Sequence, residues 1–378
     1  MSKIYLPHSE QFDLMNENLA KIANALASDI DLSTWAGIQK AVRTGVAPDL
    51  IPIGTQLAVN HSVYGERLYD VVAHNYFNSA HDKNAHTMTL MCHDVIASLQ
   101  YDAPEAFYCA DSELPAGTYN FTIPTSFGAW SAGTYQFTTT GALPKGGQLA
   151  LSVDGNTPLE SQYVVRYESN SAINQTTQYV ISLGNGGTSL GTFGVELNHT
   201  HRVAFGSNNY KESAIRQFLN SSATLGSIWK PQTKFDRRPS WSSSVAGFAG
   251  GFDDVLLSVI GEVIVPCAAN NTYESPDSTT AKGEPYTVTD KFYLASQTEI
   301  FGGATSIVVD NTVLFPYYDG ATNADRIKYS TTSSAVHWWL RSNDPWGALH
   351  LRTVNSDGGL GSNLAHNTNG VVPMCTIV

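Results

Sequence analysis

The sequence predicts an α+β fold with few helices, and three observations lead to that class. Charged residues make up only 14% of the 378 residues, while Gly, Ser, Thr, Asn and aromatic residues are abundant. That composition is typical of β-rich proteins with many loops. Helical periodicity is confined to short stretches, and strand-like alternation recurs along the chain. Short helices followed by many strands that end in long loops indicate an α+β domain.

The charge balance and the termini exclude several classes of protein. A formal net charge of −12 argues against a protein that grips phosphate backbones, so we expect no nucleic-acid partner. The N-terminus has no apolar core of signal-peptide length, and no segment approaches the about 20 apolar residues of a membrane span. We therefore expect synthesis in a cytoplasm and no membrane insertion. The cysteines are scattered without a C-x-x-C pair, which favours buried free thiols: Cys92, Cys109, Cys267 and Cys375.

Residues 1–49 are predicted to form an N-terminal helical segment. Apolar residues recur at helical spacing within residues 9–28, and a second short helix is expected over residues 32–44, ended by Gly45. Either helix packs on its own domain or joins copies of itself in a symmetric bundle. We expect this segment to serve in anchoring or oligomerisation.

Residues 50–110 change to strand patterns, in the stretches LIPIGTQLAV, YDVVAHNYF and HTMTLMCHDVI. The last two raise the question of a metal, because histidines lie in and around them: His74, His81, His86 and His93. Their spacings match neither HExxH nor a compact zinc pattern. We therefore interpret them as edge and turn residues.

Residues 111–199 have very few charges and contain an internal echo. AGTYNFT at 116–122 recurs as AGTYQFT at 132–138, and each copy alternates aromatic and polar residues after a glycine, as a hairpin strand does. Further strands are expected at QLALSV, SQYVVRYES and TQYVISLG. The pattern predicts a small all-β, sandwich-like module inserted into the surrounding domain.

Residues 200–378 return to a mixed pattern. A helix is expected around residues 213–219, and an amphipathic stretch over 251–260 leads into the strand EVIVPC. The adjacent carboxylates Asp253 and Asp254 are explained by a solvated face or a helix cap. The stretch KFYLASQTEIFG is interpreted as a strand followed by a turn.

The C-terminal region, residues 338–378, combines strand and turn signals. Val336 to Leu340 suits a buried strand, with Val371 to Val378 as its closing partner. Between them, residues 355–359 read NSDGG, which is dense turn chemistry. Large apolar side chains in the same region need burial or a partner, so we expect ordered loops held on strands.

Several stretches carry a resemblance to a known family: YKESAIRQFLN at 210–220, LASQTEIFG at 294–302, WLRS at 339–342, VNSDG at 354–358 and GVVP at 370–373. These resemble C-type-lectin-fold domains of phage and bacterial surface proteins. Many of those are variable proteins of diversity-generating retroelements, with the phage major tropism determinant as a relative in architecture. The likeness covers residues 50–111 and 203–378 and leaves the β insertion outside. The family pattern has Arg before the late proline, where this chain has Val372.

The resemblance implies a C-type-lectin fold at the C-terminus and a receptor-binding protein at the tip of a phage tail. Such proteins are usually homotrimers, contact other virion proteins, and meet a host-cell surface protein or glycan through diversified C-terminal loops. The implied location is the virion, after synthesis in the host cytoplasm.

Carried onto this sequence, the resemblance implies these diversified or ligand-contacting positions: Asp344, Trp346, Gly347, Leu349, His350, Thr353, Ser356, Gly359, Gly361, Ser362, Leu364, His366 and Thr368, with Asn343 and Asn363 beside them. A surface of Trp, Leu, His and small polar residues held on strands also suits a protein-binding patch on physical grounds. Leu351, Val354 and Leu360 are expected to be core residues.

Two alternatives stay open at this point, a carbohydrate-binding lectin and a structural virion protein. An enzyme is not expected, because no GxSxG elbow occurs, and the lectin-fold oxidases that generate formylglycine need closely placed cysteines or copper. A calcium-dependent carbohydrate-binding lectin would use oxygens such as those of Asp344, Asp357 and Asn355. A structural virion protein would bury the same loops against neighbouring subunits. No cofactor is expected outside the calcium alternative.

Overall fold

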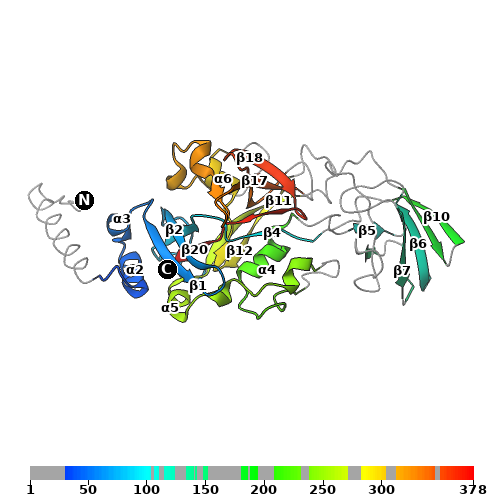
Figure 1. Ribbon diagram of the computed structural model, residues 1–378, viewed down its shortest axis with the longest axis horizontal. Helices are drawn as coiled ribbons and strands as arrows, with labels where there is room; N and C mark the ends of the chain where they lie inside the picture. Colours follow the sequence, from blue (N-terminus) through cyan, green and yellow to red (C-terminus); the bar gives the residue numbers. More distant parts are fainter. Residues whose placement is uncertain are drawn as a thin grey trace, which may run out of the picture.

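We analysed a computed structural model of the chain. It describes residues 30–103, 106–109, 115–123, 133–139, 141–142, 148–151, 180–185, 188–194, 208–230, 238–270, 282–303, 312–344 and 350–378. These residues form short helices and several β-sheets, which confirms the predicted α+β, β-rich class (Figure 1). Among them, no helix has the length and apolar character needed to cross a membrane.

The first five-stranded sheet has the order β1-β2-β3-β20-β13. Its strands are β1 (Gln56–His61), β2 (Gly65–His74), β3 (Met88–Cys92), β20 (Met374–Ile377) and β13 (Phe292–Tyr293). The C-terminal strand β20 therefore lies inside the sheet, antiparallel to both neighbours.

This pairing corrects the expected partnership of Val371 to Val378 with Val336 to Leu340. Only one parallel bridge, between Trp338 and Gly370, links that part of the chain to the tryptophan strand. Every residue of β20 is buried, so the strand needs neighbours on both sides, and β3 and β13 supply them.

The second five-stranded sheet has the order β18-β17-β16-β19-β4. Its strands are β18 (Leu360–Leu364), β17 (His350–Val354), β16 (Trp338–Asn343), β19 (Thr368–Val371) and β4 (Ala97–Gln100). In both sheets, strands from the first hundred residues pair with strands from the C-terminus. The segments on either side of the β insertion thus share their hydrogen-bonded sheets.

The second predicted helix is present and packs on its own domain. Helix α2 (Trp35–Arg43) begins after Thr34, whose hydroxyl accepts a hydrogen bond from the Gly37 N–H, and its apolar face joins the core. The chain then turns at Gly45, with φ of 76°, into the short helix α3 (Ala47–Leu50). The first predicted helix, residues 9–28, lies outside the described residues.

Two later helices also lie where the pattern placed them. Helix α4 (Ala214–Leu219) is capped by Ser213 and buries Ile215, Phe218 and Leu219. Helix α5 (Asp254–Val259) is capped by the side chain of Asp253, which accepts from the Leu256 N–H at 2.7 Å, as the cap interpretation expected.

The stretch KFYLASQTEIFG was predicted to be a strand followed by a turn; the strand is present, but a helix takes the place of the turn. Only β13 is extended, and α6 (Gln297–Phe301) follows it. The Ser296 hydroxyl accepts from the Glu299 N–H at 3.2 Å, and the Glu299 carboxylate accepts from the Ser296 N–H at 2.7 Å. This reciprocal capping box starts a helix in spite of the β-type residues before it.

The internal echo forms neighbouring strands, as predicted. Strands β6 (Gly117–Ile123) and β7 (Gly133–Thr139) pair antiparallel, and β9 (Val180–Asn185) and β10 (Thr188–Gly194) extend them into the order β10-β9-β6-β7. A separate pair joins β5 (Ala106–Cys109) to β8 (Gln148–Leu151). Figure 1 shows this β region at the far end from α2 and α3.

The remaining elements are short. Strands β11 (Val263–Asn270) and β12 (Lys282–Asp290) form a ribbon, as do β14 (Lys328–Tyr329) and β15 (Ala335–Val336). Single turns of 3-10 helix occur at Tyr210–Glu212, Ser240–Ser243, Ala249–Gly251, Pro316–Tyr318 and Asn323–Arg326.

Three cysteines are buried free thiols, as expected: Cys92, Cys267 and Cys375. Burial raises the pKa of Cys92 to about 11 and that of Cys267 to about 12, so neither is a thiolate near neutral pH.

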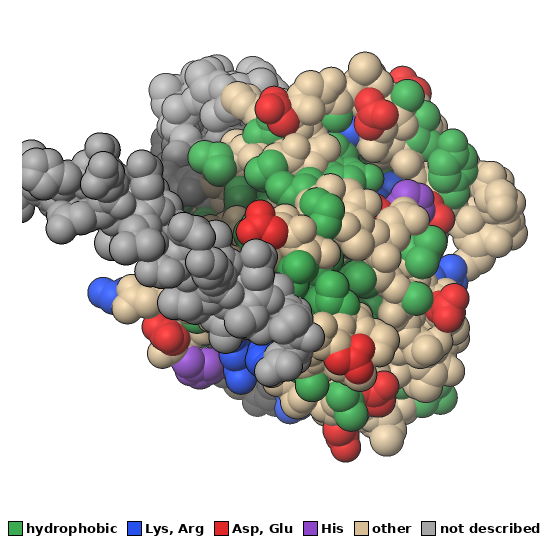
Figure 2. Space-filling view, turned by 90° about the vertical axis from the view of Figure 1, so that its left-hand side faces the viewer, with side chains coloured by type: hydrophobic (Ala, Val, Ile, Leu, Met, Phe, Trp, Pro, Cys, Tyr) green, Lys and Arg blue, Asp and Glu red, His purple; other side chains and the backbone are tan. Residues whose placement is uncertain are grey.

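Figure 2 shows the end of the molecule that carries α2, where hydrophobic side chains lie between acidic and other polar ones.

Candidate functional site

Strand β16 is wholly buried and supports the neighbouring strands β17 and β18, which carry most of the sequence-predicted site residues. The two indole N–H groups at its start donate to backbone carbonyls: Trp338 to Arg326 at 3.1 Å and Trp339 to Leu99 at 2.9 Å. Each large ring is therefore buried without leaving its polar group unpaired. This strand holds the middle of the second sheet in place.

Arg341 of β16 is the polar centre of this scaffold. Its side chain and that of Glu299 are both 0% exposed, and the two form a bidentate ion pair. The guanidinium also donates to the carbonyls of Leu294 at 2.7 Å and Pro266 at 2.9 Å. Because all these partners lie outside its own sheet, Arg341 joins β16 to α6 and β11.

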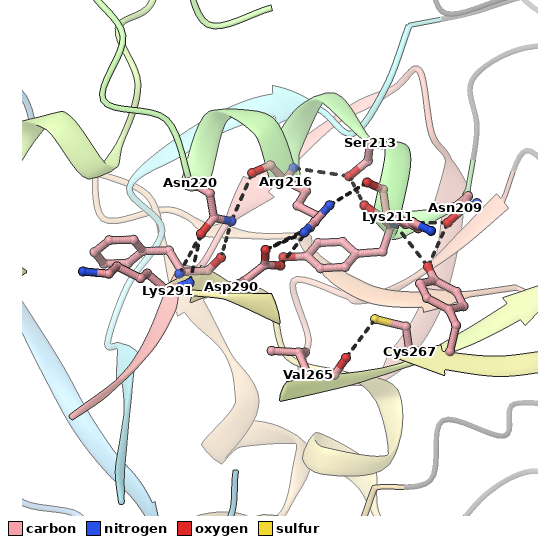
Figure 3. A network of polar contacts seen from close by, with 12 residues as sticks. Asn209, Lys211, Ser213, Arg216, Asn220, Val265, Cys267, Asp290 and Lys291 are labelled. Atoms are coloured by element: carbon pink, nitrogen blue, oxygen red, sulfur yellow. Dashed lines mark hydrogen bonds and ion pairs between the residues drawn. The ribbon is translucent and has the colours of Figure 1, made fainter. Parts of the chain in front are cut away.

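A second ion pair, between the half-buried Arg216 and the buried Asp290, holds helix α4 in place, and Figure 3 shows its contacts. The Arg216 guanidinium donates to both oxygens of Asp290 at 2.8 to 3.0 Å. Burial raises the pKa of Asp290 to about 6, and the Arg216 charge opposes that rise. Nearby, the Asn220 side chain accepts from the Phe292 N–H and donates to its carbonyl. The Arg216–Asp290 pair and the Asn220–Phe292 hydrogen bonds both stabilise the fold around helix α4.

Strands β17 and β18 form a hairpin around the predicted NSDGG turn. The Asn355 carbonyl accepts from the Gly358 N–H at 2.9 Å, and the Asn355 N–H donates to Gly359 at 2.8 Å. Gly358 has φ of 80°, and a Cβ there would lie 1.7 Å from the Asn323 carbonyl oxygen. This is a three-residue hairpin loop with its glycine in the left-handed region.

The hairpin register places four residues on one face. His350 lies opposite Leu364, and Arg352 lies opposite Ser362. Ser362 is exposed and the other three are half-buried. We call these four residues the hairpin face. They are cross-strand and diagonal neighbours, so one bound partner can contact all of them.

The charges beside the hairpin face are nearly balanced. The Arg352 guanidinium lies 3.4 Å from the Asp344 carboxylate, which is itself buried. Burial lowers the pKa of His350; the Asp344 charge opposes this effect and nearby His366 adds to it. His350 is therefore neutral at pH 7. Among the described residues, Nδ1 of His350 and Nε of Arg352 are buried without a hydrogen-bond partner.

The turn between β18 and β19 is built by asparagine side chains. The Asn363 side-chain oxygen accepts from the Leu364 N–H at 2.9 Å and from Asn367 at 2.7 Å, and its amide donates to Asn369 at 3.2 Å. The buried Ala365 anchors the turn, because its carbonyl accepts two backbone bonds from residues 101 and 102. The half-buried His366 and the exposed Thr368 are thus presented on a fixed turn.

The structure places the sequence-predicted positions in three groups. Ser362 and Thr368 are exposed; the half-buried positions are His350, Ser356, Gly359, Gly361, Leu364 and His366. Most of these lie on the hairpin face or the following turn, while Ser356 and Gly359 lie at the other end of β18. The positions Trp346, Gly347 and Leu349 lie outside the described residues.

Two predicted contact positions are corrected by their burial. Asp344 is 3% exposed, because it pairs with Arg352, and Thr353 is 1% exposed, because it faces inward opposite Trp339. Gly361 lies opposite Thr353, and a Cβ there would approach the Asn355 side chain to 2.0 Å. These positions have less freedom to vary than the exposed ones.

The neighbouring residues named by the sequence divide in the same way. Asn343 is buried at 4% exposure, and Asn363 is half-buried within the turn. Leu351 and Val354 are core residues as expected, and Leu360 is partly buried against the core. Sequence reasoning missed Arg352, although strand alternation with His350 was a signal that could have found it.

The four histidines of residues 74–93 make separate contacts. His74 bonds to the Ile51 carbonyl, His81 to Glu262, His86 to Asn75 and His93 to Asp70. Within the described part of the chain, no group of three or more His, Cys, Asp or Glu residues is placed to hold a metal ion.

A hollow of about 550 Å³ lies between α2, the loop before β3 and the end of α5. Its charged and titratable lining residues are Arg43, His81, Asp82 and His86. One cation, one carboxylate and two imidazoles favour no single charge class of ligand. The hairpin face remains the better-defined candidate.

Comparison with known proteins identifies a family. Residues 155–378, more than half of the chain, match the family described as "Domain of unknown function (DUF6273)". The protein is therefore an α+β protein that belongs to the DUF6273 family. No curated protein and no solved structure matches the chain. The family match begins inside the β insertion, whereas β1 to β4 come before it and complete both five-stranded sheets.

Proposed function

We propose that this protein is a receptor-binding protein of a phage tail that contacts the host cell through its hairpin face and the following β18–β19 turn. The observation that carries the proposal is the concentration of accessible, chemically varied side chains on that hairpin. The strand two positions away in the same sheet, β16, is wholly buried. A binding site of this kind works best on a rigid support.

Further parts of the proposal follow the sequence resemblance. They are a C-type-lectin fold, a homotrimer, contacts with other virion proteins and no catalytic role. The WLRS strand supports the fold assignment, because its Arg341 makes the buried contacts expected of a structural motif. The exposed Ser362 and Thr368 support a contact role over a purely structural one.

Existing contacts weigh against calcium-dependent sugar binding. A calcium site needs six to eight oxygen ligands at short distance. The Asp344 carboxylate already pairs with Arg352. The side-chain oxygens of Asp357 and Asn355 already accept hydrogen bonds, from the Gly359 N–H and from the His337 ring. A direct protein or glycan contact needs none of these to be released.

The proposal is tested by adding bulk at the centre of the surface. Labelled protein is applied to a panel of bacterial strains, and strains that bind it are compared with the variants Ser362→Arg and Thr331→Arg. Ser362→Arg should weaken binding about tenfold or more, because a large side chain holds a partner off the face. Thr331→Arg, at an exposed turn between β14 and β15, should bind normally.

Equal binding by both variants, or binding to none of the strains, would overturn the proposal. The encoding DNA tests the diversification part separately. A near-copy of the codons for residues 339–378, differing mainly at adenines and lying beside a reverse-transcriptase gene, is expected. Its absence would remove programmed diversification and leave a fixed binding role.

A further inference from the structure

Strand β18 is an edge strand, and its hydrogen-bonding phase is fixed by the hairpin turn. The bond from the Asn355 N–H to the Gly359 carbonyl starts the ladder, and bonded and non-bonded pairs alternate from there. Gly361 and Asn363 therefore direct their N–H and C=O groups inward to β17. The corresponding groups of Leu360, Ser362 and Leu364 point outward from the sheet.

The outward groups differ in whether they are occupied. The Leu364 N–H donates to the Asn363 side chain at 2.9 Å, and the Leu364 carbonyl accepts from the Asn367 N–H at 2.9 Å. Within the described part of the chain, the outward N–H and C=O of Leu360 and Ser362 have no such partner. The open edge of β18 thus spans Leu360 to Ser362. At Leu364 the outward backbone groups are occupied by the turn between β18 and β19.

We propose that a protein partner adds an extended peptide segment to this edge as a sixth strand, antiparallel or parallel to β18. The inference rests on the proposed function and names the partner class of that same surface. The outward N–H and C=O groups of Leu360 and those of Ser362 lie about 7 Å apart, two residues along the strand. Another β-strand has the same repeat and can pair with them. Main-chain pairing of this kind provides affinity, and neighbouring side chains provide specificity.

The hairpin face makes the edge suitable for recognition. Ser362 contributes both an outward backbone and a side chain on that face, next to the half-buried His350, Arg352 and Leu364. A segment added at the edge places alternate side chains beside these residues.

The short window argues for a peptide of another protein rather than a second copy of β18. Three residues are fewer than the five or six of a usual strand, so edge-to-edge pairing of two such windows would be weak. A partner peptide gains further contacts from its own side chains on the hairpin face. A second copy is therefore treated as a competing outcome.

The test uses the full-length protein and a library of synthetic ten-residue peptides, with a glycan array in parallel. Wild-type protein and the control variant Thr331→Arg, at the exposed turn between β14 and β15, should select the same peptides. Ser362→Pro should bind them about tenfold more weakly or worse, because proline lacks the outward N–H and its ring blocks the edge. Circular dichroism checks the fold of each variant.

A second measurement does not depend on the proline variant. Selected peptides are N-methylated at alternate residues in two registers. One register should abolish binding to wild-type protein, and the other should leave it within about twofold, because only alternate N–H groups face β18.

Several results would overturn the inference. They are selection of glycans alone, equal binding by Ser362→Pro, equal effects of both methylation registers, or a dimer of the chain that Ser362→Pro dissociates in sedimentation experiments. The Ser362→Arg test on cells is independent of these outcomes. If Ser362→Arg blocks cell binding but no peptide is selected, the proposed function stands and the strand-addition inference fails.

Discussion

Strands β16 and β18 lie two positions apart in one sheet, yet they have opposite surroundings. All six residues of β16 are buried, whereas β18 has one exposed residue and four half-buried ones. The polar groups of Arg341 on β16 are paired with a carboxylate and two carbonyls. On β18, the outward backbone of Ser362 has no partner within the described residues.

The difference separates stability from recognition between strands that lie two positions apart in the same sheet. A site that binds variable partners needs side chains that can change without unfolding the domain, and the buried strand provides that tolerance. Substitutions in β16 should therefore act on folding, and substitutions in β18 should act on binding.

The largest effect is expected at the buried ion pair. Arg341→Ala leaves the Glu299 carboxylate buried without its partner and should cost about 3–5 kcal/mol of unfolding free energy. The matched variant Arg352→Ala removes a longer pair, 3.4 Å, whose arginine is 14% exposed, and should cost less, about 1–2 kcal/mol. Urea denaturation measures both. Similar losses for the two arginines would remove the distinction between the strands.

A smaller effect is expected at the hairpin turn. Gly358→Ala places a Cβ against the Asn323 carbonyl at a positive φ and should cost about 1–3 kcal/mol. Gly359→Ala meets no atom closer than 3.1 Å and should stay within about 0.5 kcal/mol. Thermal or urea unfolding of the two variants gives the comparison. If Gly359→Ala were the more damaging change, the turn geometry described above would be wrong.

The pH should act in opposite directions on the two regions. His350 has a lowered pKa, so its contribution to stability is lost as pH falls below the unfolded value of 6.5. Asp290 has a pKa raised to about 6, so its contribution is lost as pH rises from about 4 to 6.

Two variants isolate these contributions. Relative to His350→Gln, wild-type protein should lose stability as pH falls from 7 to 5.5. Relative to Asp290→Asn, it should lose stability as pH rises from 4 to 6.5. Denaturation at several pH values tests both slopes, and slopes of the same sign would contradict the assignment.

The smallest effect is expected at the exposed positions. Ser362→Ala and Thr368→Ala should each change the unfolding free energy by less than about 0.5 kcal/mol, because neither side chain is buried. A loss of more than about 1 kcal/mol in urea denaturation would show that these side chains belong to the scaffold.

Local sequence signals predicted much of the fold. The AGTY echo formed a paired β6 and β7, the glycine-rich NSDGG formed a hairpin loop, and α4 and α5 began at their capping residues. Each of these features is determined by neighbouring residues. The error at α6 was also local, since Ser296 and Glu299 have the spacing of a capping box.

Long-range features were harder to predict. The sequence of β20 is that of a buried strand, but nothing in its residues selects β3 and β13 over β16 as neighbours. Asp344 and Thr353 have the residue types of a surface, and their burial depends on Arg352 and Trp339 from the register of the sheet. Alternation along β17 identified the hairpin face only once the pairing with β18 was known.

One measurement tests the central claim most directly: saturation mutagenesis of residues 338–378, scored separately for folded protein and for binding to a bacterial strain that the wild-type protein recognises. We expect losses of folded protein to concentrate in β16, Gly358 and β20. Losses of binding alone should concentrate at Ser362, Leu364, His366 and Thr368. If substitutions at these four positions left binding unchanged, the hairpin and its following turn would not be the binding surface.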